Sequence, residues 1–239
     1  MKHYHGFPIT PDTAATEVAM AGHGLISWRY PGQLSMVMEL CQSFILDNGA
    51  FSAWFDKKPV TDWSAYYTWV ADIMRHPGFD WAIIPDVIDG AEFDNDMLLA
   101  EWPHGPFVGV PVWHMHESLE RLSRLCDDYP RVCIGSSGEY ATVGDAKWWD
   151  RMHIAMGAIC DQDGYPRTKL HGLRMLNPKV FTKLPFASTD SSNIGRNVGI
   201  DKKWHGTYTP MTKAARASVM RKRVEHFNSA QKWTDPLFQ

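Results

Sequence analysis

Cysteine is scarce in this chain. Only four cysteines occur in 239 residues, and no two of them are close enough to form a Cys-x-x-Cys pair. So sparse a set excludes a disulfide scaffold and offers no zinc-ligand spacing, so we expect no metal and no other cofactor. We expect reduced, mostly buried thiols in a cytoplasmic protein. The residues are Cys41, Cys126, Cys133 and Cys160.

Long apolar runs and an overall basic charge are also lacking. No stretch approaches the ~18 apolar residues of a membrane span, and residues 1–11 lack the apolar core of a signal peptide. We therefore expect no membrane partner. The formal net charge of −3 excludes the bulk electrostatic signature of a nucleic-acid-binding protein, although a local basic patch remains compatible with it.

Repeats, low-complexity linkers and a Gly-x-Gly-x-x-Gly turn after the first strand are absent as well. We therefore expect residues 1–239 to form one domain, and the missing glycine turn weakens the case for a Rossmann fold. Eight strand-like runs alternate with helical patterns, which is typical of βαβ units. Eight strands favour an α/β barrel of the (β/α)8 TIM type, and an open doubly wound sheet is the alternative. The expected strands are His5–Thr10, Gly24–Trp28, Ser43–Asp47, Trp81–Asp86, Phe107–Trp113, Arg131–Gly135, Lys169–Met175 and Pro185–Asp190.

Helix signals lie between several of these strands and after the last one. Each is a capping residue or a proline in the first turn, followed by apolar residues at helical spacing. The expected helices begin at Thr61 (running to Arg75), Ser118, Asp145 and Asn177-Pro178, and a C-terminal helix spans 212–232.

Three of the expected strands end in aspartate, namely Asp47, Asp86 and Asp190. In a (β/α)8 barrel the carboxyl ends of the strands build the active site, so we expect these carboxylates to converge. Like charges held together raise pKa values and separate acid from base roles. The alternative is that each aspartate caps the next helix. That alternative suits Asp47 least, because Asn48-Gly49 predicts a turn with positive φ and no immediate helix.

Further polar residues follow the next two strands. His114 and His116 predict a hydrogen-bonding pocket more strongly than a metal site, because no third ligand lies nearby in the sequence. Gly135 is followed by Ser136 and, after a second glycine, by Glu139. Glycines there let a flat ligand approach backbone N–H donors, and an ordinary glycine turn is the alternative.

The C-terminal segment is rich in cations, with Glu225 as the acid among them. It predicts either a solvated helix face or a phosphate-contacting helix whose affinity falls steeply with salt. The candidate nucleic-acid-binding residues are Arg196, Lys202, Lys203, Lys213, Arg216, Arg221, Lys222 and Arg223.

Taken in order, these motifs resemble the tRNA-guanine transglycosylase superfamily. That family has Asp-Ser-Gly-Gly-Phe, a following aspartate, a Gly-Gly-Leu-Ala-x-Gly-Glu run and a Phe-Asp-Ser or Phe-Asp-Cys segment. Each motif alone is weakly specific, and their order and position on strand ends carry the resemblance. Between about Phe44 and Asn197 this chain has Asp47-Asn-Gly-Ala-Phe, Asp86, Gly135-Ser-Ser-Gly-Glu139, His171-Gly172 and Asp190-Ser-Ser.

The resemblance implies a barrel enzyme that exchanges guanine for a 7-deazaguanine base, such as 7-cyano-7-deazaguanine, as its co-substrate. By position, Asp190 is then the nucleophile that forms a covalent aspartyl-glycosyl intermediate, and Asp47 is the general acid/base. Asp86 grips the purine edge, while Gly135 and Ser136 donate to the base carbonyl. The remaining substrate-binding positions are Asn48, Gly49, Trp113 or His114 where the family has a glutamine, Glu139, His171 and Gly172.

Two departures from the family bear on the substrate. The cysteine-rich zinc site that follows the nucleophile is missing, and the chain is much shorter than typical tRNA-modifying members. Both features resemble the branch from phages and bacteria that inserts 7-deazaguanines into DNA. DNA is therefore the expected partner, and the bacterial cytoplasm is the expected location of a phage-encoded protein.

A base inside a duplex is out of reach, so the target nucleotide must be flipped out or single-stranded. Trp54, Trp113 and Tyr140 are the stacking candidates. Three alternatives stay open: the same exchange on tRNA, a barrel hydrolase of nucleosides or glycosides with Asp47 and Asp190 as acid and nucleophile, and a binding module without activity. A homodimer is compatible with the sequence.

Overall fold

Nine strands form one parallel sheet in the computed structural model, which describes residues 1–200, 204 and 208–234. Their order is β5-β4-β3-β2-β1-β9-β8-β7-β6, and every pair of neighbouring strands in this order is parallel. The strands are β1 (Lys2–Phe7), β2 (His23–Ser27), β3 (Ser43–Asp47), β4 (Phe79–Ile83), β5 (Gly109–Val110), β6 (Val112–His114), β7 (Arg131–Gly135), β8 (Lys169–Gly172) and β9 (Ser188–Ser191).

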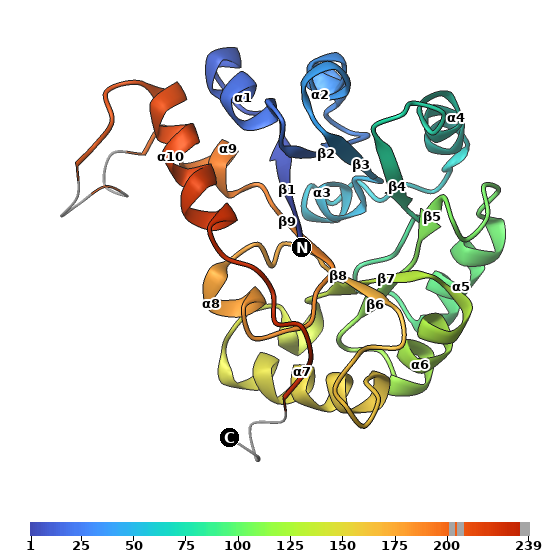
Figure 1. Ribbon diagram of the computed structural model, residues 1–239. Helices are drawn as coiled ribbons and strands as arrows, with labels where there is room; N and C mark the ends of the chain where they lie inside the picture. Colours follow the sequence, from blue (N-terminus) through green and yellow to red (C-terminus); the bar gives the residue numbers. More distant parts are fainter. Residues whose placement is uncertain (201–203, 205–207, 235–239) are drawn as a thin grey trace.

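The two ends of this strand order belong to one stretch of chain. Only Pro111, which has no N–H to donate, separates β5 from β6. Because β5 pairs with β4 and β6 pairs with β7, segment 109–114 joins both edges of the sheet into a nearly closed barrel (Figure 1). With β5 and β6 counted together, the eight expected strands and the (β/α)8-type barrel are confirmed, and the open sheet is not.

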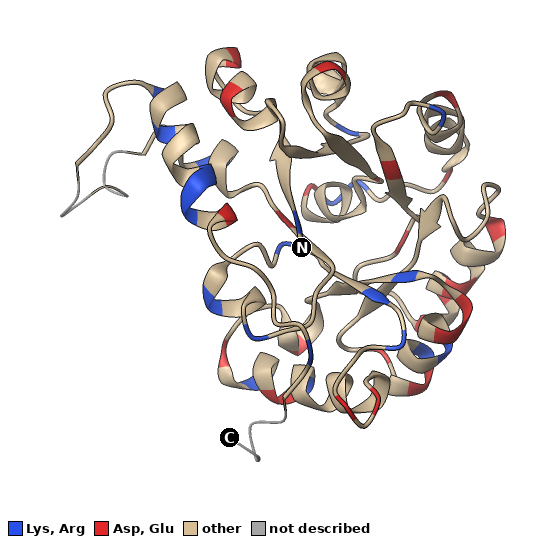
Figure 2. Cartoon of the chain, in the orientation of Figure 1, with Lys and Arg blue, Asp and Glu red and all other residues tan. Residues whose placement is uncertain are grey.

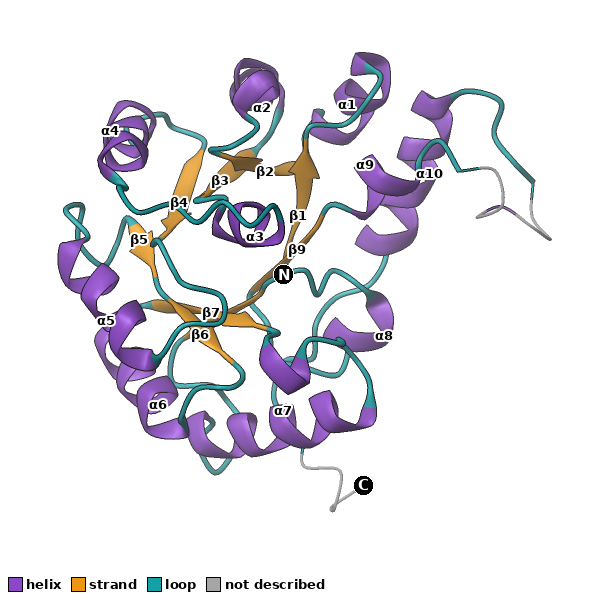
Figure 3. Cartoon of the chain, turned by 180° about the vertical axis from the view of Figure 1, so that it is seen from behind, coloured by secondary structure: helices purple, strands orange, loops and turns teal. Residues whose placement is uncertain are grey.

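Helices surround the ring of strands, whereas α3 is projected inside the ring in both views (Figures 1 and 3). Among the described residues no helix is long and apolar enough to cross a membrane. The α-helices are α1 (Asp12–Ala19), α2 (Leu34–Leu40), α3 (Ala50–Phe55), α4 (Ser64–Ile73), α5 (Glu92–Glu101), α6 (Leu119–Asp128), α7 (Ala146–Ile159), α8 (Pro178–Phe181), α9 (Asn193–Asn197) and α10 (Lys213–Glu225), and the 3-10 turns are η1 (Pro31–Gln33) and η2 (Gly138–Tyr140).

Three predicted helix starts are confirmed. The side chains of Ser118, Asp145 and Asn177 each accept a hydrogen bond from a backbone N–H two or three residues further on. These bonds satisfy donors that the first turn of a helix leaves free, which is why such residues mark helix starts in the sequence.

Two helix bounds differ from the expectation. The helix expected from Thr61 starts at Ser64, whose backbone N–H donates a hydrogen bond to the side chain of Asp62. The C-terminal helix ends at Glu225 and does not reach residue 232. Beyond it the chain turns toward β1, where the carbonyl of Phe227 bonds to His3 Nε2 at 2.9 Å.

Several strand bounds also shift by a few residues. β1 ends at Phe7, before Pro8, because a proline cannot donate to the ladder. β8 ends at Gly172 and not at Met175, because Arg174 has a left-handed backbone (φ 60°) that an extended strand excludes.

Alternation along the strands separates the barrel interior from the outer layer. On β3, Ile45 packs inward with Tyr4 and Trp81, whereas Phe44 and Leu46 pack outward against the helices. All four cysteines are free thiols, as expected. Two of them are buried and two are partly accessible.

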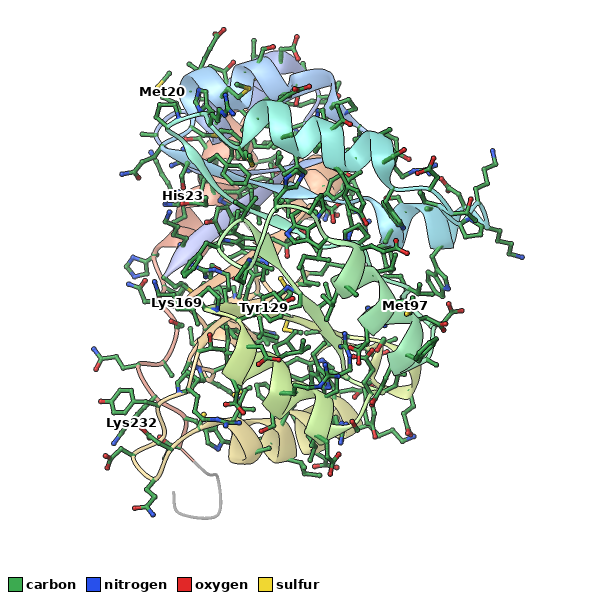
Figure 4. All side chains as sticks on the ribbon, turned by 90° about the vertical axis from the view of Figure 1, so that its right-hand side faces the viewer. Met20, His23, Met97, Tyr129, Lys169 and Lys232 are labelled. Carbon is green, nitrogen blue, oxygen red and sulfur yellow. The ribbon has the colours of Figure 1, made fainter. Side chains whose placement is uncertain are left out.

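Polar contacts fill the N-terminal end of the barrel. Lys2 Nζ bonds to both carboxylate oxygens of Asp80 at 2.6 and 2.7 Å, and Tyr4 donates to the same group at 2.6 Å. These donors hold the pKa of Asp80 below its usual value, although burial alone would raise it. Figure 4 shows His23 and Lys169 on this same face, opposite the carboxyl ends of the strands.

Helix α10 packs on the outside of the barrel against α1, with its Lys and Arg residues shown in blue in Figure 2. The Arg221 guanidinium donates from Nη1 to the carbonyls of Glu17, Val18 and Met20 at 2.7–3.2 Å. Its Nε bonds to Glu225 at 2.9 Å. One cation of the basic helix therefore satisfies the carbonyls that the end of α1 leaves without partners.

Replacing Arg221 with alanine is expected to destabilise the fold. The change leaves the α1 carbonyls and Glu225 without their donor, which should lower the free energy of unfolding by about 2 kcal/mol. Urea unfolding of the wild type and Arg221→Ala measures this loss. Lys222→Ala, an exposed neighbour without such contacts, is the matched control. Equal midpoints for the two variants would contradict a structural role for Arg221.

Candidate active site

The three strand-end aspartates line one cavity of about 660 Å³ at the carboxyl ends of the strands. Asp47 ends β3, Asp86 follows β4, and Asp190 lies in β9. His114 at the end of β6 lines the same cavity. The expected convergence is therefore found, in a volume typical of sites for small ligands.

Asp47 is held at the base of a tight turn. Gly49 has a left-handed backbone (φ 77°), and its N–H donates to Asp47 Oδ2 at 3.1 Å. The predicted positive φ is confirmed, but the expectation that no helix follows at once is wrong, because α3 begins at Ala50. A Cβ at position 49 would lie 2.7 Å from Arg29 Cγ, so both strain and contact require glycine there.

The carboxyl of Asp47 has a strongly raised pKa. Burial raises it to about 7, and the nearby charges of Asp190 and Asp86 add to the rise. The Ser27 hydroxyl and the Gly49 N–H act in the opposite direction. Near neutral pH this group can therefore both hold and release a proton.

Asp86 is buried and paired on both carboxylate oxygens. Asn48 Nδ2 donates to Oδ1 at 2.8 Å, and His114 Nε2 lies 2.9 Å from Oδ2. Asn48 also donates to the carbonyl of Ile84 at 2.9 Å, which ties β3 to the loop after β4. Asp86 thus orients an imidazole whose other nitrogen lies beside Gly135, where a Cβ would be only 3.1 Å from it.

A buried network behind His114 was not identified from the sequence. Glu117 Oε2 accepts the His114 backbone N–H at 2.8 Å and Arg121 Nη1 at 2.6 Å, and its Oε1 accepts Asn95 Nδ2 at 2.8 Å. Asn95 Oδ1 in turn accepts the N–H of Val87, directly after Asp86, at 2.7 Å. The helical spacing of Glu117 and Arg121 is the signal that was available in the sequence.

Asp190 is fixed through one oxygen only. Its Oδ1 accepts the backbone N–H of Arg174 at 2.9 Å and lies 3.2 Å from His171 Nε2. Burial lowers the pKa of His171, so its imidazole stays neutral and its Nδ1 can accept from Ser188 at 2.8 Å. No described residue forms a hydrogen bond with Asp190 Oδ2, which leaves that oxygen available to a ligand.

Some of the expected substrate-binding residues lie elsewhere. Trp113 is fully buried on the outer side of β6, where its indole donates to the Ser118 carbonyl at 2.9 Å. Glu139 is exposed and pairs with Lys147 at 2.6 Å. These two positions are corrected, because strand alternation points the first outward and the turn η2 carries the second away from the cavity.

Of the expected glycine and histidine positions, some line the cavity and others lie behind it. Gly135 and Ser136 line the cavity, whereas Gly172 packs against Met175 and Phe186 and does not. His171 is buried beneath Asp190 and reaches a ligand only through that carboxylate.

Two pairs of neighbouring residues in the sequence occupy different places in the structure. His114 lines the cavity, whereas His116 bonds to Ser137 at 2.7 Å outside it. Asp86 lines the cavity, whereas Asp89 lines a neighbouring apolar groove beside α3 and α5.

The basic candidates are mostly remote from the cavity. Arg196 lines it, together with Arg174, a residue that the sequence did not single out. Lys202 and Lys203 fall outside the described residues. The others belong to α10 on the flank of the barrel: Lys213, Arg216, Arg221, Lys222 and Arg223.

The stacking candidates do not line the cavity. Trp54 is 43% exposed in the apolar groove beside α3, and Tyr140 lies under the Arg151 guanidinium. Phe51 on α3 does line the cavity and was missed, although it is the last residue of the quoted Asp47 motif.

The described part of the chain holds no group of three or more His, Cys, Asp or Glu residues arranged as metal ligands. Comparisons with protein-family models, with curated proteins and with solved structures found no match.

The raised pKa of Asp47 predicts a pH-dependent stability. The Asp47 carboxyl has a pKa near 7 in the folded protein and near 3.8 in the unfolded chain. Its contribution to folding stability is therefore complete below pH 3.8 and is lost as the pH rises through 7. An asparagine at position 47 does not titrate, so the variant keeps its stability as the pH rises. The Tm of Asp47→Asn relative to that of the wild type should therefore be higher at pH 8 than at pH 5. Calorimetry at both values tests this, with Asp89→Asn as control. An Asp47→Asn difference that does not change with pH would contradict the raised pKa.

Proposed function

We propose that the protein is a base-exchange enzyme that replaces guanine in DNA with a 7-deazaguanine through a covalent aspartyl-glycosyl intermediate. The observation that carries the proposal is that Asp190 and Asp47 line the same cavity. One carboxylate has an oxygen that receives no hydrogen bond from any described residue, and the other has a pKa of about 7. A nucleophile and a proton carrier are the two groups that the exchange needs.

In the first step Asp190 Oδ2 attacks the anomeric carbon of the target nucleotide. The bond from that carbon to guanine N9 breaks, guanine leaves with the electron pair, and the protonated Asp47 supplies its proton. In the second step Asp47 takes the N9 proton of the incoming base, which attacks the anomeric carbon and releases the Asp190 carboxylate. The two inversions retain the configuration of the sugar, as in retaining glycosidases.

Recognition of the base falls to the opposite side of the cavity. Each carboxylate oxygen has two acceptor sites, so Asp86 can still accept from a purine edge while it holds Asn48 and His114. His114, where the family has glutamine, can bond to the ligand through Nδ1. Gly135 leaves this nitrogen uncovered, because any Cβ there would lie 3.1 Å from it.

The preference for DNA over tRNA rests on the resemblance, since no cysteine follows Asp190 to build the family's zinc site. The cavity lies at the barrel mouth, so a base must leave a duplex to reach Asp190. A covalent intermediate also requires that water be kept out until the second base arrives. Phe51 and Ile88 are apolar side chains of the cavity lining suited to this exclusion.

Nucleoside mass analysis tests the proposal. Guanine-containing DNA, duplex and single-stranded, and tRNA in parallel are incubated with the protein and 7-cyano-7-deazaguanine. We expect the deazaguanine nucleoside in DNA alone. Asp190→Asn removes the nucleophile while it can still accept the Arg174 N–H, so the rate should fall on the order of a thousandfold or more.

Asp89→Asn is the matched control, because this exposed carboxylate lies outside the cavity, and it should keep wild-type rates. Product in tRNA alone would retain the exchange chemistry and overturn the substrate. Release of guanine without an incoming base would favour a hydrolase. If the protein binds nucleic acid but forms no product, the remaining interpretation is a binding module without catalytic activity.

A further inference from the structure

Two exposed arginines stand on the Asp190 side of the cavity. Arg174 follows β8 and Arg196 lies on α9, and both side chains line the cavity. The pKa of Arg174 is lowered by partial burial and by the charge of Arg196, so the two cations lie close enough to repel each other. Repulsion of this kind favours an anion that can bind between them.

The backbone of Arg174 is strained. Its φ of 60° lies in the left-handed region, where residues other than glycine and asparagine are uncommon. Its N–H is bonded to Asp190, and its guanidinium lies over the Phe51 ring, 4.1 Å from the centroid. A strained residue that aims a cation into a cavity is typical of ligand clamps.

Two arginines of the basic helix differ in having protein acceptors for their guanidinium N–H groups. Arg221 caps α1 and pairs with Glu225, and Arg216 donates to the carbonyl of Pro210 at 2.9 Å. By contrast, no ion pair involves Arg174 or Arg196 anywhere in the described ranges 1–200, 204 and 208–234. Their guanidinium groups remain available to a ligand.

We propose that Arg174 and Arg196 form a phosphate-binding subsite that holds a phosphate on the sugar whose anomeric carbon faces Asp190. The subsite makes the substrate a phosphorylated nucleoside unit and excludes a free nucleoside. This deepens the proposed function, on which it rests for the place of the sugar. Two forked donors on separate elements suit the tetrahedral oxygens of phosphate, either as a terminal group or as a diester.

Calorimetric titration with guanosine, guanosine 5′-monophosphate and a deoxytrinucleotide with central guanosine tests the subsite. We expect the wild type to bind the monophosphate, the trinucleotide or both at least about tenfold more tightly than guanosine. Arg174→Gly is the informative variant. It relieves the left-handed strain and keeps the N–H to Asp190, so it should fold at least as stably and still lose that preference.

Three further variants complete the experiment. Arg196→Gln should lose the preference as well, and Arg75→Gln, an exposed arginine after α4, should keep it. Ala21→Gly relieves a similar positive φ (53°) far from the cavity, and it should keep the preference too. A stable Arg174→Gly protein with the full phosphate preference would assign Arg174 a structural role and overturn the proposal.

The ligands separate the sources of phosphate and the two proposals. Preference for the monophosphate alone assigns a nucleotide, and preference for the trinucleotide assigns a nucleic-acid diester. Equal binding of guanosine and both phosphorylated ligands, or no binding of either phosphorylated ligand, overturns the subsite and leaves the base-exchange assay to decide the proposed function. A phosphate preference lost in Arg174→Gly, without any base exchange, supports the subsite and removes the proposed function.

Discussion

Repulsion among carboxylates is the constraint around which the mouth of this barrel is arranged. Asp47, Asp86 and Asp190 share one cavity, and their charges would oppose folding if nothing offset them. Asp86 accepts from Asn48 and His114, and Asp190 accepts at one oxygen from His171 on β8 and from the N–H of Arg174 just after it. The remaining cost is concentrated on Asp47, where burial and the two neighbours raise the pKa to about 7. One group is thereby suited to carry a proton while another presents a free oxygen.

The positions of these groups depend on two tight turns and on closure of the sheet. Gly49 after β3 and Arg174 after β8 both have left-handed backbones, and each donates its N–H to a cavity aspartate. Closure at Pro111 brings β4 and β7 to the same segment, so His114 can reach Asp86 across the interior. An open sheet would leave the β4 and β7 ends of the site apart.

Much of the barrel could be predicted because its signals are local. Alternation along β3 and the side-chain caps at Ser118 and Asp145 depend on residues adjacent in sequence. The strand-end aspartates follow from the same pattern, since parallel strands bring their carboxyl ends together.

What could not be predicted depends on contacts between distant segments. Glu117 bonds to Asn95, 22 residues away, and Arg221 caps a helix about 200 residues before it. Trp113 was misplaced because only its register in the pleat decides whether it faces the cavity. Arg174 was missed because a left-handed arginine has no local sequence signal, whereas the glycine of Asn48-Gly49 does.

The two sides of the cavity differ in rigidity, and this difference bears on how a ligand enters. On one side Asp86 and His114 are buried and clamped through Glu117 and Asn95. Burying the Glu117–Arg121 ion pair costs free energy, and in return the pair helps to hold the His114 imidazole in place. On the other side Arg174 and Arg196 are exposed. Under the proposed function, a flat base binds against the rigid side, while the sugar and its phosphate stay at the open side beside the free Asp190 oxygen.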